Sequence, residues 1–163
     1  MKDATRQIWK AWIPAIIWLC IITFESTDYL SSDHTSRILY PVLHYLLGLD
    51  LVRFEVWHHY IRKTGHFVGY FTLSCLLFRA WKASLPVAAA KRWVMRWANV
   101  SFLMTVLVAS LDEWHQTFIP SRTGTVRDAI LDSAAALTAQ IVTFLLLRGT
   151  RPQASKRSSS VVP

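Results

Sequence analysis

Four long apolar runs constrain the fold of this chain more than any other feature. They cover residues 8–24, 65–81, 97–114 and 129–147. A helix needs about 20 residues to cross the roughly 30 Å hydrocarbon core of a membrane, and each run is near that length. With 53% hydrophobic residues in 163, the chain is also more apolar than one soluble core of this size requires. The runs therefore predict an all-α fold, an integral membrane bundle of four transmembrane helices.

The distribution of Lys and Arg predicts how this bundle is oriented. Twelve basic residues and one acidic residue lie in three segments: residues 1–10, the 79–97 connection and the tail from Arg148. The alternate segments, 25–63 and 112–128, hold six basic and eight acidic residues. The positive-inside rule places the basic segments, and so both termini, in the cytoplasm. The net charge of +8 does not predict a nucleic-acid partner, because these charges are not gathered into one stripe on a surface.

Two segments outside the spans differ from the rest of the chain. The outer segment contains SRILYPVLHYLLGLD, which is too short to span a membrane and includes Pro41, so we expect an amphipathic interfacial or re-entrant piece. We expect His58, farther along this segment, in a wet loop or interfacial position. Residues 1–147 are expected to form one membrane domain, followed by a basic, Ser-rich, disordered cytoplasmic tail over 148–163.

Polar side chains gather at the outer ends of the last three runs. Nine of them are candidate site residues: Lys63, His66, Tyr70, Asp112, Glu113, Gln116, Arg122, Asp128 and Asp132. Lys63, His66 and Tyr70 recur at i, i+3 and i+7, which places them on one face of a helix. Asp112 and Gln116 share a face at i and i+4. Because ionisable groups at this depth are costly unless they pair or line a wet cavity, we predict one polar site where three helices converge.

Two sequence blocks carry a resemblance to a known family. RKTGHFVGYFTL resembles the K-x-x-H-F-x-x-Y-x-x-L stretch of VanZ-like membrane proteins. DEWHQTFIPSRTGTVRDAILDSAAA resembles the D-E-x-x-Q-x-F-x-P-x-R of that family, followed by D-x-x-x-[ND]-x-x-G, with Ala135 in place of the final Gly. The resemblance covers about residues 8–147 and singles out the same nine residues together with Phe118 and Pro120. The founding member is linked to low-level teicoplanin resistance, so the resemblance implies a bacterial inner-membrane protein of the cell envelope, without assigning resistance to this chain.

The leading functional hypothesis is recognition of an anionic lipid, glycolipid or cell-wall precursor headgroup at the outer leaflet. Arg122 would offer a planar, bidentate donor to a phosphate or carboxylate, and Lys63 a point charge beside it. The other expected ligand-binding residues are Tyr70, Gln116, Asp128 and Asp132. Membrane lipids are the expected partners.

Catalysis on the bound headgroup is left open by the sequence. His66 could exchange protons near neutral pH, and Asp112 or Glu113 could act as a base or orient the basic residues. Transfer or hydrolysis at a phosphate or glycosyl group is then the class to test. The nucleophile motifs GxSxG, SxxK and HExxH are absent from the chain.

Two further hypotheses stand beside this one. The same polar residues could form an ion network that locks the helices of a non-catalytic membrane scaffold. Alternatively, His66, His115, Asp112 and Asp128 could supply a mixed nitrogen and oxygen shell for a metal. His115 lies outside the pattern of the family, so the sequence reading adopts neither a metal nor a cofactor, and it leaves the oligomeric state open.

Overall fold

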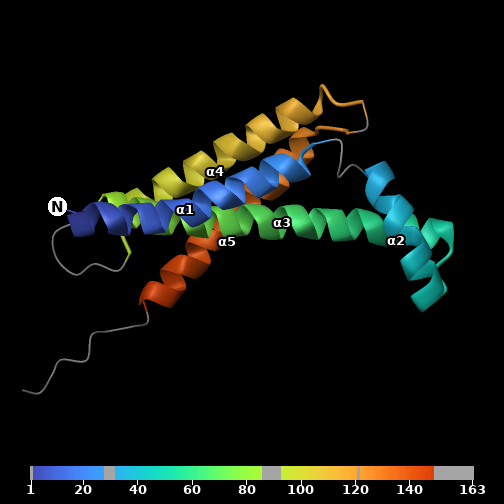
Figure 1. Ribbon diagram of the computed structural model, residues 1–163, viewed down its shortest axis with the longest axis horizontal. Helices are drawn as coiled ribbons and strands as arrows, with labels where there is room; N and C mark the ends of the chain where they lie inside the picture. Colours follow the sequence, from blue (N-terminus) through green and yellow to red (C-terminus); the bar gives the residue numbers. More distant parts are fainter. Residues whose placement is uncertain (1, 28–31, 86–92, 121, 149–163) are drawn as a thin grey trace, which may run out of the picture.

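The structure is a computed structural model that describes residues 2–27, 32–85, 93–120 and 122–148. These residues form five α-helices and no strand (Figure 1). The helices are α1 (Lys2–Glu25), α2 (Ser32–Leu47), α3 (Leu51–Ser84), α4 (Met95–Gln116) and α5 (Val126–Arg148). Each predicted apolar run lies inside one helix, so the all-α prediction is confirmed. The predicted disordered tail, from residue 149 onward, lies outside the described residues.

The central element of the fold is α3, which packs against α1, α4 and α5 and, near its start, against α2. Its 34 residues make a rod of about 50 Å at a rise of 1.5 Å per residue. The bundle formed with α1, α4 and α5 covers only the second part of this rod, and the first part projects beyond the bundle and carries α2 (Figure 1). We call this projecting first part of α3 the arm. The bundle and the arm therefore share one helix.

Small residues allow the helices of the bundle to approach closely. Ala135, Ala136 and Ala139 of α5 are fully buried, as expected for a small-residue face in a membrane bundle. Two tryptophans of α1 then fasten it to α3: Trp18 donates through Nε1 to the carbonyl of Gly69 at 2.9 Å, and Trp12 donates to the hydroxyl of Ser84 at 2.7 Å. The bundle is thus held by close backbone packing and by indole hydrogen bonds.

The junction between α2 and α3 follows from its local sequence. Gly48 adopts a positive φ of 64°, which suits the residue that ends a helix, and the side chain of Asp50 caps α3 by accepting from the backbone N–H of Arg53 at 2.8 Å. His58 of α3 is buried and lies 3.0 Å from the hydroxyl of Thr35 on α2. His58 is therefore buried on a helix and does not lie in a wet loop, because α2 folds back over it, while its expected interfacial position stays a prediction.

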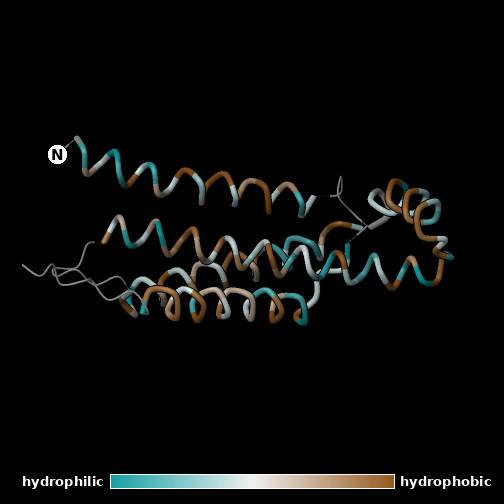
Figure 2. The backbone as a smooth tube through the Cα atoms, turned by 90° about the horizontal axis from the view of Figure 1, so that it is seen from below, coloured by the Kyte–Doolittle hydropathy of each residue, from teal (hydrophilic) through white to brown (hydrophobic). Residues whose placement is uncertain are grey.

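The outer surface of the bundle is strongly apolar. Large hydrophobic side chains are exposed along three helices, for example Ile13, Ile17 and Phe24 of α1, Leu103 and Leu107 of α4, and Leu137, Ile141 and Leu145 of α5. Figure 2 shows α1 changing from hydrophilic in its first turns to hydrophobic over the rest. Within the described residues, two segments are long and apolar enough to cross a membrane, Asp3–Glu25 and Val126–Arg148. These features favour a membrane protein, and the span of all four helices stays a prediction.

Candidate functional site

The face of α3 that carries Lys63, His66 and Tyr70 meets carboxylates from two other helices. Lys63 forms an ion pair with Asp128 of α5. Tyr70 donates its hydroxyl to Asp112 of α4 at 2.9 Å, and the Nδ1 atom of His66 lies 3.6 Å from Asp132 of α5. The structure therefore brings together residues that lie more than 40 positions apart in the sequence.

A constant register between α3 and α5 explains the pairs Lys63–Asp128 and His66–Asp132. Lys63 and Asp128 are 65 residues apart, and Ser74 and Gln140, farther along the same helices, are 66 apart. His66 and Asp132 are also separated by 66. An offset that stays constant means that the two helices run parallel, so residues with the same spacing on each helix face one another.

Asp112 and Gln116 share a face of α4, as their spacing predicts. A single oxygen of Asp112 accepts from Tyr70 and from Nε2 of Gln116 at 3.0 Å. Gln116 is buried and also donates to the hydroxyl of Ser26, just after α1, at 3.3 Å. This part of the site joins α1, α3 and α4 through hydrogen bonds.

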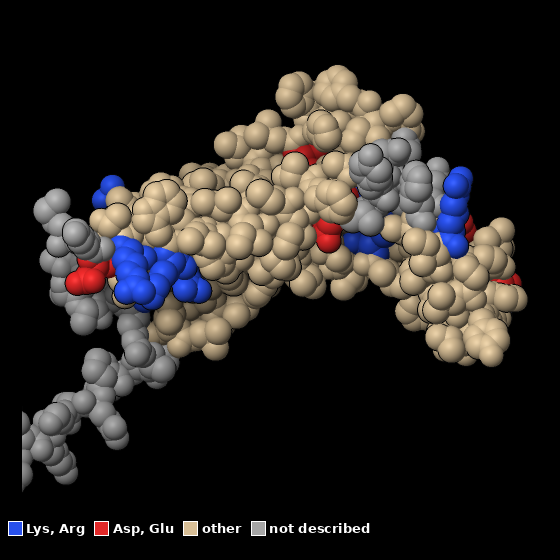
Figure 3. Space-filling model, viewed as in Figure 1, with Lys and Arg blue, Asp and Glu red and all other residues tan. Residues whose placement is uncertain are grey.

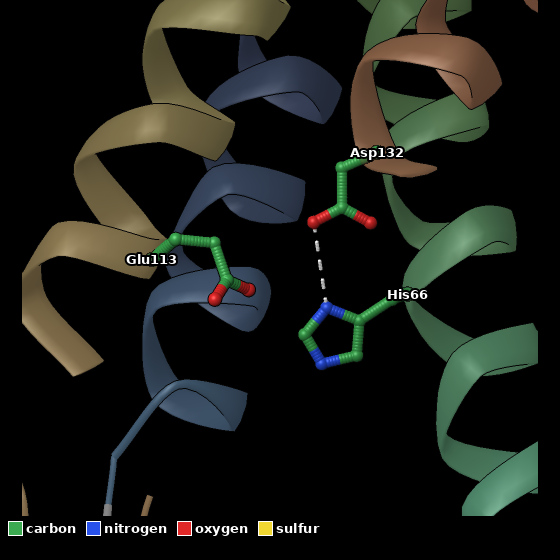
Figure 4. A group of neighbouring side chains, drawn as sticks. All are labelled: His66, Glu113 and Asp132. Atoms are coloured by element: carbon green, nitrogen blue, oxygen red, sulfur yellow. Dashed lines mark ion pairs between the residues drawn. The ribbon is translucent and has the colours of Figure 1, made fainter. Parts of the chain in front are cut away.

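Glu113 faces a different neighbour from Asp112. It points from α4 toward His66 of α3 and Asp132 of α5 (Figure 4), and one ligand atom from each of the three residues lies within 4.8 Å of the others. We call His66, Glu113 and Asp132 the carboxylate cluster. Asp132 is 0% exposed, and neither of its carboxylate oxygens has a hydrogen-bond partner.

The loop between α4 and α5 fixes the position of Glu113. The backbone N–H of Thr125 donates to Oε2 of Glu113 at 2.8 Å. Gly124, the preceding residue, lies so close to α4 that a Cβ atom there would be 2.1 Å from the carbonyl oxygen of Glu113. Glycine is required because no larger residue fits this approach.

Arg122 joins the same loop to the end of α1. Its Nη2 atom donates to the backbone carbonyls of Glu25 and of Thr27, the second at 2.9 Å. The side chain is largely buried and lines both polar cavities described next. Arg122 therefore holds the loop against the end of α1 and also contributes to the lining of the cavities.

A polar cavity of about 280 Å³ opens beside these residues at the start of the bundle. Its lining is Glu55, His58, His59, Arg62, Lys63, His66, Gln116, Arg122, Thr123 and Asp128. A second cavity of about 240 Å³ shares Arg62, His66 and Arg122 with the first. Three permanent cations line the larger cavity against two carboxylates, so its lining favours an anion.

The sequence reading missed the part of this lining that comes from the arm. Glu55, Arg62 and His66 are spaced at i, i+7 and i+11, which is one face of a helix, so the signal was present in the sequence. The predicted site leaves out Glu55 and Arg62 because the apolar run that predicts the second span begins only at residue 65. His58 has a lowered pKa there, since burial and the charge of Arg62 both disfavour its protonated form.

Two further features do not belong to the site. His115, a member of the alternative metal shell, is exposed on α4 and is not in the carboxylate cluster. An apolar cavity of about 480 Å³ lies between α4 and α5, lined by residues such as Phe102, Leu137 and Phe144.

Comparison with known proteins adds one finding. A family model described as VanZ/LLP1 matches residues 11–147, which is most of the chain and includes every residue of the site. No curated protein and no solved structure matches the chain.

Proposed function

Because the chain belongs to the VanZ-like family, we propose that it is a multi-pass membrane protein of the bacterial cell envelope that binds an anionic lipid or lipid-linked precursor headgroup. On the family resemblance alone, we extend the proposal to a link with glycopeptide tolerance. The cavity lined by Arg62, Lys63 and Arg122 is the observation that carries the headgroup proposal.

In the proposed topology, α1, α4, α5 and the second part of α3 cross the bacterial inner membrane with both termini in the cytoplasm. The distribution of charge supports this orientation. Arg6, Lys10, Arg79, Lys82 and Arg96 come from segments that meet at the end of the bundle where α1 starts (Figures 1 and 3). The polar cavity lies near the opposite end, which the positive-inside rule places outside the cytoplasm.

In the same topology, α2 lies on the outer surface of the inner membrane. Ile38, Val42, Tyr45 and Leu46 are exposed and recur at i, i+4, i+7 and i+8, so they form an apolar stripe. A short helix with such a stripe lies in the interface with its apolar face in the acyl boundary. The arm of α3 then stands at headgroup level, where Arg62 would meet phosphates.

The charge of the cavity lining supports an anionic ligand. A guanidinium binds phosphate or carboxylate through parallel N–H donors, and charge-assisted hydrogen bonds are about twice as strong as neutral ones. The carbonyl contacts of Arg122 hold its guanidinium plane in a fixed orientation at the cavity. This reduces the side-chain entropy that is lost when a ligand binds. If the bound lipid is also processed, His66 is a group of the cavity lining that is suited to exchange a proton.

A second candidate function has its own supporting observation. Lys63 and Tyr70 each have a partner on another helix, so the polar residues could serve only to lock the helices of a scaffold. In this alternative the cavity needs no ligand. The two functions differ in what a charge-removing substitution in the lining does.

Native mass spectrometry with lipidomics on gently extracted protein separates the two candidates. We expect wild type to retain a specific anionic lipid that Arg62→Gln and Arg122→Gln lose. Arg127→Gln is the matched control, because this exposed arginine near the start of α5 lies outside the cavity lining. Equal lipid in all four proteins would contradict the headgroup proposal. Failure of the Arg122 variant alone to accumulate in the membrane would favour the scaffold.

A further inference from the structure

We propose that the carboxylate cluster, His66, Glu113 and Asp132, is a binding site for a divalent transition-metal ion such as Zn²⁺. The three side chains come from α3, α4 and α5 and point toward a common centre (Figure 4). One ligand atom from each lies within 4.8 Å of the others. This site stands on its own residues and does not depend on the headgroup proposal.

The burial of Asp132 is the first argument for a bound cation. Its side chain is 0% exposed, and both oxygens lack a hydrogen-bond partner. A buried carboxylate with no hydrogen bond is costly, and its ion pair with His66 depends on a proton on the imidazole. A metal ion would supply the missing contact.

The orientation of Glu113 is the second argument. One oxygen accepts the N–H of Thr125, while the other, Oε1, is buried and has no hydrogen-bond partner. Protein groups that hold one side of a metal ligand in this way fix the direction of its free side. The loop through Gly124 therefore fixes the Glu113 carboxylate by Oε2 and leaves Oε1 as the oxygen without a hydrogen bond.

The donor set identifies the class of ion. One imidazole with two carboxylates suits zinc and other divalent transition metals, whereas magnesium prefers oxygen ligands and retains several waters. Tetrahedral zinc with bonds of about 2.0–2.2 Å separates its ligand atoms by roughly 3.3–3.6 Å. The 3.6 Å between His66 and Asp132 is at that spacing. Two carboxylates and a divalent ion also sum to no net charge, which lowers the cost of burial.

The open side of the site faces the polar cavity. His66 is part of the lining of the cavity of about 280 Å³, so a metal held by three protein ligands would have its fourth position toward that space. Catalytic zinc sites commonly have three protein ligands and such an open position. An anionic oxygen or a water molecule in the cavity would complete the coordination.

The experiment is a Zn²⁺ titration of chelator-treated, untagged protein in detergent by isothermal calorimetry. Elemental analysis of the dialysed product gives the metal content. We expect one Zn²⁺ per chain in wild type and much weaker binding of Mg²⁺. Loss of a partner outside the ligand shell already costs about 10–100-fold in metal affinity. We therefore expect Asp132→Asn and Glu113→Gln to weaken Zn²⁺ binding by about a hundredfold or more.

Two control variants identify nonspecific binding. Asp112→Asn removes a neighbouring carboxylate that binds Tyr70 and Gln116 instead, and His115→Ala removes an exposed imidazole. Both should bind Zn²⁺ like wild type. Absence of stoichiometric Zn²⁺ in wild type would overturn the proposal, even if the cluster variants fail to fold. Equal binding by wild type and folded Asp132→Asn would also overturn it.

The result is separable from the headgroup proposal. Arg62→Gln removes a cavity cation that is not a proposed metal ligand, so this variant should lose the anionic lipid and still bind Zn²⁺. Loss of Zn²⁺ in a folded Arg62→Gln protein would contradict the proposed ligand set, because a guanidinium is not a metal ligand.

Discussion

Two buried polar clusters join α3 to α5, and they differ in charge and in hydrogen bonding. In the first, the amide cluster, Gln140 donates through Nε2 to the hydroxyl and the carbonyl of Ser74 at 2.7 and 3.2 Å. In the second, the carboxylate cluster, both oxygens of Asp132 lack a hydrogen bond. The clusters are eight residues apart on each helix, or about 12 Å.

The difference shows what helix packing alone requires. A neutral amide and a hydroxyl are enough to join α3 to α5 in the interior, and only Oε1 of Gln140 lacks a partner there. Ionisable residues cost more to bury than neutral ones. The carboxylate cluster is therefore not explained by the need to hold the two helices, and it is the better candidate for a function.

The largest effect is expected from Gly124→Ala, which disturbs one cluster and not the other. The new methyl group would collide with the carbonyl of Glu113, so the loop must move and the Thr125–Glu113 hydrogen bond is lost. We expect a loss of about 1–3 kcal/mol in the free energy of unfolding, the usual cost of overpacking. Unfolding by denaturant in detergent micelles measures it. Thr123→Ala, an exposed residue of the same loop, should change little.

Asp132→Asn is expected to stabilise the metal-free protein by roughly 1 kcal/mol, because a neutral amide costs less to bury than a carboxylate whose oxygens accept no hydrogen bond. The measurement is the same unfolding titration in the presence of a chelator. A loss of more than about 2 kcal/mol would mean that Asp132 is a structural residue after all, and the two clusters would then have the same role.

Gln140→Leu is expected to act in the opposite direction and by a similar or smaller amount. Hydrogen bonds between helices in membrane proteins are worth about 0.6 kcal/mol on average and up to about 1.7, so we expect a loss within that range. Lipid and Zn²⁺ binding should be retained. A Gln140→Leu protein that loses either ligand would contradict the structural role of the amide cluster.

The smallest effect concerns His58, a buried histidine of α3 whose ring lies beside the hydroxyl of Thr35. Its pKa is lowered by burial and by Arg62, so the folded state favours neutral His58 compared with the unfolded state. The docking of α2 is therefore fully stable above the ordinary histidine pKa of about 6.5 and loses stability as pH falls below it. With spin labels attached at positions 45 and 60, in place of Tyr45 and Tyr60, the distribution of distances between them should broaden at low pH in the otherwise wild-type protein but not in His58→Gln.

The helices could be predicted from the sequence because each apolar run has the length of a span and polar segments separate them. The shared face of Lys63, His66 and Tyr70 followed from spacing alone. Which carboxylate meets which partner did not follow, because that depends on the register of α3 against α5. Asp112 and Glu113 are adjacent in sequence but point about 100° apart on the helix, and only the packed structure separates their roles.

The unbroken length of α3 has a mechanical consequence. It runs from Leu51 to Ser84 without a proline, and helices kink sharply at only a few kinds of site, proline being the commonest. The arm under α2 and the turn that holds His66 are consequently parts of one continuous helix, which the bundle holds at its second part. A displacement of α2 that tilts the arm would therefore be expected to move the imidazole of His66 relative to Glu113 and Asp132, which lie on other helices.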